Sequence, residues 1–225
     1  MKRKITYLIF AVVGIMMTVY LTCDVLSLWD SRPLKFITSA VVTAFGLSFI
    51  SKKESRFVSL ALIFTLTADV FFVLMNKFIF GVAVFILVQL AYTAHFSYLS
   101  EKTLWKEILK RILPGVIGGV VVIALGAEVK LAVTVLYACT IAVNFAHAIE
   151  LYVQKRSKAQ LILLLGFILL AVGDVCVGLR NLSADFVTVG FAKVCYFITW
   201  LSYPPSQLLI LASTGVLPLK KEKQN

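Results

Sequence analysis

Charged residues are scarce in this chain, and their scarcity excludes an ordinary soluble fold. Only 15% of the 225 residues are Asp, Glu, Lys or Arg, whereas a soluble domain usually has about a quarter. Hydrophobic residues make up 60%, and the mean hydropathy is +0.96. The few charges lie in short runs between long uncharged stretches. This pattern is typical of a polytopic membrane protein, in which each span needs about 20 apolar residues.

Cysteine and histidine are also rare, which limits metal and disulfide chemistry. The cysteines are Cys23, Cys139, Cys176 and Cys195. They form no CxxC pair and lie in apolar stretches, so we interpret them as small buried side chains. The two histidines, His95 and His147, lie near the predicted cytoplasmic ends of their spans. A catalytic zinc site needs three protein ligands, and we therefore predict neither a metal nor another cofactor.

Hydropathy divides the chain into eight candidate spans, and we predict one all-α transmembrane domain over residues 1–225. The spans cover approximately 5–23, 34–51, 57–75, 78–98, 110–126, 131–149, 159–179 and 186–213. The short links at 76–77, 127–130 and 180–185 favour antiparallel helical hairpins. The N-terminal apolar run is long for a signal peptide and has no small-x-small cleavage site, so we interpret it as a first span.

The net charge of +11 indicates membrane topology rather than nucleic-acid binding. Basic residues flank the apolar stretches, where they orient spans and contact anionic lipid headgroups. With the N-terminus in the cytoplasm, the inside segments hold 16 of the 22 Lys and Arg and the outside links hold five, while Lys193 falls within the last span. This asymmetry predicts a multi-pass protein of the cell membrane with both termini in the cytoplasm.

Two spans resemble each other. "ALIFTLTADVFFVLMNKF" and "LLGFILLAVGDVCVGLRNL" both contain a small residue followed by Asp and Val, then a Leu five residues after the Asp, then a short polar turn. The two aspartates, Asp69 and Asp174, are four spans apart in the predicted order. An offset of an even number of spans gives both units the same orientation, which indicates a parallel repeat of two four-helix units.

Asp69, Asp174 and Lys193 are predicted to lie at the same depth in the membrane. Counted from the outer links at 1.5 Å per residue, they are roughly 9 to 12 Å inside, and we expect no other charged residue to lie as deep. A carboxylate at bilayer depth costs about 2.5 to 3.5 kcal/mol on insertion scales. One lysine cannot neutralise both carboxylates, so we expect one aspartate protonated and the other ionised, as in an acid and base pair. A purely structural ion pair is the alternative.

Other polar residues occupy the spans that follow each aspartate. Gln89 and Tyr92 share one helix face, and Tyr203 and Gln207 share another. They either line the same cavity as the aspartates or form hydrogen bonds between helices, and Asn144 is a similar candidate. Pro204 and Pro205 are expected to bend the last span and to free backbone carbonyls that need other partners.

The motifs around these residues resemble the YhhN family. "TADVFFVLMNKFIFGVAVFILVQLAYTAHF" resembles its first motif, "AVGDVCVGLRNL" its second Gly-Asp motif, and "LSYPPSQLLIL" its closing Tyr-rich helix. The family includes lysoplasmalogenases, membrane enzymes that hydrolyse the vinyl-ether bond of lysoplasmalogens. The resemblance implies that Asp69 and Asp174 are catalytic. It also matches Gln89, Tyr92, Tyr203 and Gln207 to other motif positions, with Gln89 where a histidine is often found; Lys193 matches none.

The leading hypothesis is therefore a membrane hydrolase that acts on a lyso-ether lipid. Protonation of the enol carbon by a neutral carboxyl group begins such a reaction, and a nearby carboxylate stabilises the cation and activates water, as in two-carboxylate glycosidases. Gln89, Tyr92, Lys193, Tyr203 and Gln207 are the supporting candidates. A small transporter or proton-coupled carrier would use the same Asp and Lys residues. A scaffold with a structural Asp–Lys–Asp triad is the third alternative.

Overall fold

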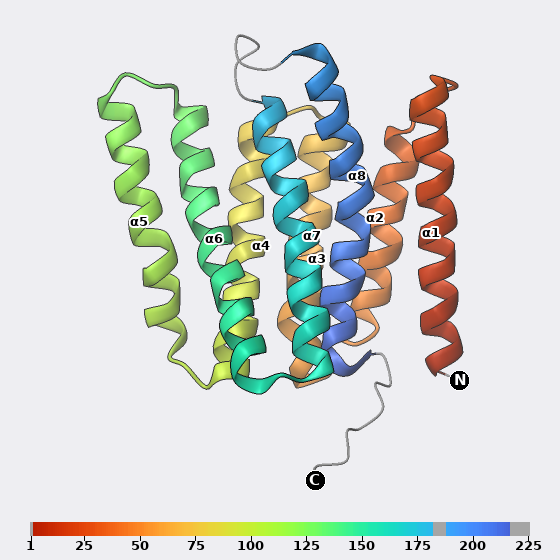
Figure 1. The fold of residues 1–225 in the computed structure, drawn as a ribbon, viewed down its shortest axis with the longest axis horizontal. Helices are drawn as coiled ribbons and strands as arrows, with labels where there is room; N and C mark the ends of the chain where they lie inside the picture. Colours follow the sequence, from red (N-terminus) through yellow and green to blue (C-terminus); the bar gives the residue numbers. More distant parts are fainter. Residues whose placement is uncertain (1, 182–187, 217–225) are drawn as a thin grey trace.

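The computed structural model describes residues 2–181 and 188–216, which form a bundle of helices that run side by side (Figure 1). Among these residues there are eight α-helices, two π-helical turns and no strand. The helices are α1 (Lys2–Leu26), α2 (Arg32–Leu47), α3 (Lys53–Asp69), η1 (Val70–Leu74), α4 (Phe78–Ser100), α5 (Leu104–Ala124), α6 (Val129–Lys155), α7 (Lys158–Asn181), α8 (Val189–Leu211) and η2 (Ala212–Val216). The predicted all-α fold class is confirmed.

Each of the eight predicted spans overlaps one α-helix. Five of the helical segments are long and apolar enough to cross a membrane, namely Ile5–Leu26, Lys53–Leu74, Phe78–Ser100, Val129–Lys155 and Lys158–Asn181. Large apolar side chains of the outer helices α1 and α5 face outward, including Ile15, Val120 and Leu125, as a lipid-facing surface requires. The helices thus indicate a membrane protein, while eight crossings stay a prediction.

The two ends of the described chain lie at the same end of the bundle, as an even number of helices requires (Figure 1). We refer to this as the lower end, where α1 begins and η2 ends. At the upper end α2, α4, α6 and α8 begin and α1, η1 and α7 end. That the lower end faces the cytoplasm stays a prediction from the distribution of basic residues.

The two aspartate-bearing hairpins differ in local structure. The α3–α4 and α7–α8 pairs both pack closely, as the predicted repeat expects. After Asp69, however, the chain widens into the π-helical turn η1, and the amide N–H of Met75 donates to the carbonyl of Val70 at 2.9 Å. Helix α7 instead continues as an α-helix for seven residues after Asp174. The parallel repeat therefore stays a prediction.

Glycine allows α7 to pack directly against α8. A Cβ on Gly173 would lie 2.8 Å from the Ser202 hydroxyl, and one on Gly166 would lie 2.7 Å from the side chain of Ile210. A larger residue at Gly166 would also meet the Ile210 backbone nitrogen at 3.0 Å and would push the two helices apart, whereas at Gly173 the Ser202 hydroxyl would have to move. Since Asp174 follows Gly173 directly, this close approach also fixes the position of that aspartate relative to α8.

Pro204 and Pro205 lie inside α8, as the sequence predicted. Proline has no amide hydrogen, so Pro204 leaves the carbonyl of Trp200, four residues earlier, without its helical donor. The hydroxyl of Tyr20 on α1 donates to this carbonyl at 2.8 Å. The Tyr20 side chain is completely buried, and its ring lies edge-on to that of Trp200. The freed carbonyl thus anchors α1 to α8.

We predict that Tyr20→Phe destabilises the protein by about 1 kcal/mol, because the ring packing stays while the Trp200 carbonyl loses its donor. Unfolding in mixed detergent micelles, followed by tryptophan fluorescence, measures this change. Tyr98→Phe is the matched control, because Tyr98 is 41% exposed. Equal stability of the Tyr20→Phe variant and the wild type would show that the hydrogen bond from Tyr20 to the Trp200 carbonyl does not stabilise the fold.

The predicted topology can be tested by cysteine labelling. Asn76 in the link between η1 and α4 is exposed at the upper end, and Ser51 in the link between α2 and α3 is exposed at the lower end. In a background without native cysteines, we expect Asn76→Cys to react with an impermeant maleimide on intact cells and Ser51→Cys to react only after lysis. The reverse pattern would invert the orientation.

Candidate active site

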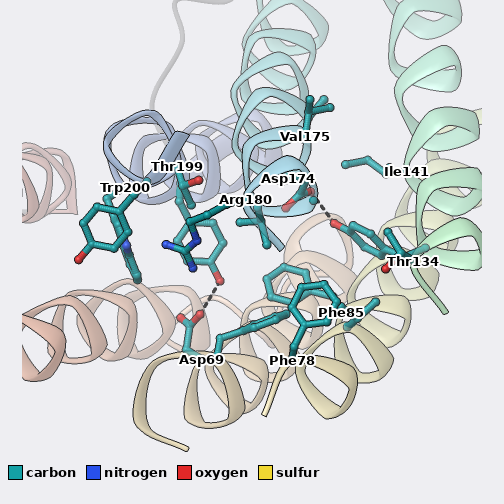
Figure 2. A pocket seen from close by; sticks show the side chains of 18 of the residues that line it. Asp69, Phe78, Phe85, Thr134, Ile141, Asp174, Val175, Arg180, Thr199 and Trp200 are labelled. Carbon is teal, nitrogen blue, oxygen red and sulfur yellow. Dashed lines mark hydrogen bonds between the residues drawn. The ribbon is translucent and has the colours of Figure 1, made fainter. Parts of the chain in front are cut away.

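A cavity of about 500 Å³ lies in the upper half of the bundle, and both Asp69 and Asp174 line it (Figure 2). Its other polar lining residues are Arg32, Lys35, Asn76, Thr134, Tyr137, Arg180, Tyr196, Thr199 and Tyr203. Apolar side chains of η1, α4, α6, α7 and α8 form the rest of the wall, among them Phe72, Phe85, Ile141, Val175 and Trp200. Two carboxyl groups from helices distant in sequence thus share one apolar cavity.

Asp69 is the last residue of α3 and is almost completely buried, with 3% of its surface exposed. Its Oδ1 accepts a hydrogen bond from the hydroxyl of Tyr203 on α8 at 2.9 Å. Its Oδ2 is buried and accepts no hydrogen bond of ordinary geometry among the residues that the structure describes, although the Ser39 hydroxyl on α2 is close enough to the carboxyl group to interact with it. A buried carboxyl oxygen without a donor is costly when it is charged.

Asp174 has a different environment, because it lies at the end of a chain of hydrogen-bond donors. The hydroxyl of Tyr137 on α6 donates to its Oδ2 at 2.5 Å. Tyr137 in turn accepts from the Gln89 side-chain amide at 3.3 Å, and Gln89 Oε1 accepts from Asn144 at 2.8 Å. The Asn144 Oδ1 accepts from Arg111 Nε at 2.7 Å. Every link therefore donates in the direction of Asp174.

The far end of this donor chain is a buried polar cluster near the lower end of the bundle. Arg111 has no exposed side-chain surface, and its guanidinium donates to Glu107 at 2.9 Å. It also lies 3.0 Å from His147 Nδ1. Because arginine only donates, Nδ1 accepts and His147 carries its proton on Nε2, which donates to Ser100 at 2.8 Å. The Ser100 hydroxyl then donates to the Phe96 carbonyl.

The structure places the predicted supporting residues at different distances from the cavity. Tyr203 lines it and contacts Asp69, whereas Gln89 acts one step away, through Tyr137. Tyr92 is buried against Phe167, with ring centroids 5.1 Å apart. Gln207 is buried as well, and its side-chain amide has no hydrogen-bond partner among the described residues. Neither Tyr92 nor Gln207 lines the cavity, so their roles stay predictions.

Lys193 does not lie where the depth count placed it. That count began at residue 185, but α8 begins at Val189, so Lys193 is only four residues into the helix. Its side chain is exposed and does not line the cavity. The structure therefore brings the two predicted aspartates together, but Lys193 is not part of their cluster.

A different lysine is buried near the cavity. Lys35 on α2 donates to Asp24 at 2.5 Å, to Ser31 at 2.8 Å and to the hydroxyl of Tyr196. Its side chain has no exposed surface. It thus pairs with Asp24 rather than with either cavity aspartate.

Two other charged residues, Lys35 and Arg111, are fully buried inside the bundle, whereas the relative depth of the charges in the membrane stays a prediction. Both residues follow short polar segments and were counted with the links. Arg111 has one signal in the sequence, since Glu107 lies four residues before it, where a helix brings the two side chains together. The partner of Lys35 is eleven residues away on another helix, and no local pattern indicates it.

These features define an all-helical membrane protein with two carboxyl groups in one internal cavity. The chain belongs to the YhhN family, whose sequence model matches residues 32–214. This range includes every residue of the cavity lining and of the donor chain. Searches among curated proteins and among solved structures found no match to the chain.

We predict that Arg111→Met destabilises the protein by about 3 to 5 kcal/mol, because it removes the buried cation that pairs with Glu107 and leaves Asn144 Oδ1 with only the Thr93 hydroxyl as a donor, at 3.2 Å. Lys110→Met is the matched control. Lys110 also binds Glu107, at 2.7 Å, but 63% of its side chain is exposed, so we expect a loss below about 1 kcal/mol. Thermal unfolding in detergent compares the two variants; equal losses would contradict the structural role of Arg111.

Proposed function

We propose that this protein hydrolyses the vinyl-ether bond of a lysoplasmalogen, giving a fatty aldehyde and a glycerophospho-base. The observation that carries the proposal is the presence of Asp69 and Asp174, from two separate helices, in the lining of one cavity. Membership of the YhhN family supports it, because that family resemblance implies an ether-lipid hydrolase. Substrate and activity are our inference.

The shape and composition of the cavity are suitable for a single-chain lipid. Thr134, Ala138, Ile141, Ala142 and Phe145 of α6 line one wall. Their spacing places them along one face of the helix, and eleven residues extend about 16 Å at 1.5 Å per residue. An alkenyl chain can lie along this face while the polar headgroup stays near the upper end.

The surroundings of the two carboxyl groups favour different roles. Asp174 accepts from a donor chain that begins at the permanent charge of Arg111, and such donors stabilise a carboxylate. It is also less buried than Asp69. Asp69 is more deeply buried, and its Oδ2 accepts no hydrogen bond of ordinary geometry, so a proton there removes the cost of a buried charge. We therefore assign Asp69 as the acid and Asp174 as the base, the division that other two-carboxylate sites use.

The reaction then needs only these two groups and one water. Asp69 gives its proton to the enol carbon, and the ether oxygen becomes part of an oxocarbenium ion that ionised Asp174 stabilises. Asp174 takes a proton from water as the water oxygen bonds to the cationic carbon, which gives a hemiacetal. The hemiacetal collapses when Asp174 returns that proton to the ether oxygen and Asp69 takes the hydroxyl proton. The products are the aldehyde and the alcohol, and both carboxyl groups return to their initial states.

A proton-coupled carrier is the second candidate function, because polar contacts extend from the cavity to the cluster near the lower end of the bundle. The nature of the links argues against proton passage. Arg111 donates without losing its proton, and the amides of Asn144 and Gln89 are fixed donors toward Asp174. Proteoliposomes with an internal pH dye test this alternative, for which protein-dependent proton flux is the required result.

We predict that Asp69→Asn and Asp174→Asn each lower aldehyde release from lysoplasmenylethanolamine at least about 100-fold, the usual contribution of one general acid or base. Purified protein in detergent is the test material. Glu128→Gln is the matched control, because Glu128 is an exposed acid at the same end of the bundle and does not line the cavity. No aldehyde from folded wild-type protein would refute the proposed function, and full activity in both Asn variants would refute the site.

The same assay in D₂O tests the chemical step. Protonation at carbon predicts that the aldehyde carries one deuterium on the carbon next to the carbonyl, which mass spectrometry detects. An aldehyde without deuterium would show that the bond is broken in another way.

A further inference from the structure

Three cationic side chains lie around Tyr196 in the upper part of the cavity lining, and we call Arg32, Lys35, Arg180 and Tyr196 the cavity rim. Two of the three cations are paired. Lys35 binds Asp24, and Arg32 binds Asp30 at 2.8 Å. The hydrogen bonds from Arg32 lower the pKa of Asp30 below its ordinary value, which favours the ionised form of this carboxyl group.

Arg180 differs from the other two cations of the cavity rim. Its guanidinium lies over the ring of Tyr196, 5.2 Å from the centroid, and it has no ion pair with any carboxylate of the described residues. Figure 2 shows its side chain extending over the cavity on the side of Thr199. The Tyr196 ring thus holds the Arg180 guanidinium, while no carboxylate of the described residues pairs with it.

The position of Arg180 relative to Asp174 suits one part of the proposed substrate. Arg180 is six residues after Asp174 on α7, so its backbone is about 9 Å farther along the helix axis. In a lysophospholipid, a glycerol unit shorter than this rise separates the phosphate from the sn-1 ether oxygen, and the long arginine side chain can cover the difference. A phosphate bound at Arg180 therefore brings the sn-1 bond near the two aspartates and the chain toward the apolar face of α6.

We propose that Arg180 binds the phosphate group of a single-chain lipid and is the residue by which this cavity selects lysophospholipids over neutral lipids of the same chain. A planar guanidinium forms two parallel hydrogen bonds to phosphate, and an ammonium group cannot reproduce this geometry. Arg180 is a binding residue in this proposal and takes no part in proton transfer. The inference rests on the proposed function for its substrate class.

Binding of lipids that the enzyme cannot hydrolyse tests this proposal separately from activity. The probes are 1-acyl-lysophosphatidylethanolamine and the 1-monoacylglycerol with the same chain, measured by thermal stabilisation of the protein in detergent. We expect Arg180→Gln to weaken binding of the phosphate-bearing lipid roughly 10- to 100-fold, the size of a lost charged hydrogen bond. Binding of the monoacylglycerol should stay unchanged.

Two further variants make the test specific. Lys77→Gln removes an exposed cation at the same end of the bundle that does not line the cavity, and we expect it to behave as the wild type. Lys193→Gln tests the competing assignment from the sequence. If Lys193→Gln weakens binding of the phosphate-bearing lipid and Arg180→Gln does not, the proposal is overturned.

Glycerol 3-phosphate has the phosphate and the glycerol but no acyl chain. Its binding tests whether the site recognises a phospholipid or any phosphate ester. We expect it to bind at least about 100-fold more weakly than the lysophospholipid, because the chain supplies most of the buried apolar area. Equal affinity would show a site for free phosphate esters and overturn the lipid proposal. If Arg180→Gln weakens binding of the lysophosphatidylethanolamine and of the monoacylglycerol equally, Arg180 does not recognise the phosphate, and the proposal is overturned. Selective phosphate binding by a protein that releases no aldehyde would refute the proposed hydrolysis alone.

Discussion

The structure depends on how one carboxylate is stabilised inside an apolar bundle. Asp174 accepts from Tyr137, and the donors behind Tyr137 lead through Gln89 and Asn144 to Arg111. These residues belong to α4, α5, α6 and α7, so one polar chain fixes four helices relative to one another. Where no water is available, each of these groups must be satisfied within the protein. The same contacts that satisfy them also aim the Tyr137 hydroxyl at the cavity.

Close backbone contacts complete this arrangement on the other side of the cavity. Gly173 allows α7 to approach α8, and the proline-freed carbonyl of Trp200 is bound by Tyr20 of α1. Trp200 and Tyr203 both line the cavity. The prolines that remove backbone hydrogen bonds from α8 thus lie where α8 forms a cavity wall, and a side chain from a helix distant in sequence replaces one of the lost donors.

The helices and the two aspartates could be predicted from the sequence, because both follow from the cost of placing polar groups in hydrocarbon. Each apolar run became a helix, and Asp69 and Asp174 lie in one cavity. The remaining polar partners could not be predicted, since Tyr137, Arg111 and Lys35 depend on which helices are neighbours. Lys193 was misplaced because the true start of α8 shifts its depth by a helical turn. Asp69 also precedes a π-helical turn for which the sequence has no clear signal, although such turns are frequent at functional sites.

Each of the two aspartates accepts a hydrogen bond from one tyrosine of the cavity lining, but only one of these tyrosines ends a long donor chain. Tyr203 donates to Asp69 and Tyr137 to Asp174, so each carboxyl group has one phenol. Only Tyr137 itself accepts from further donors that end at a permanent positive charge. A second such chain to Asp69 would stabilise its ionised form and leave the cavity with two bases. In the reaction that we propose, this single chain places the negative charge on Asp174 and leaves the proton on Asp69, as protonation at carbon requires.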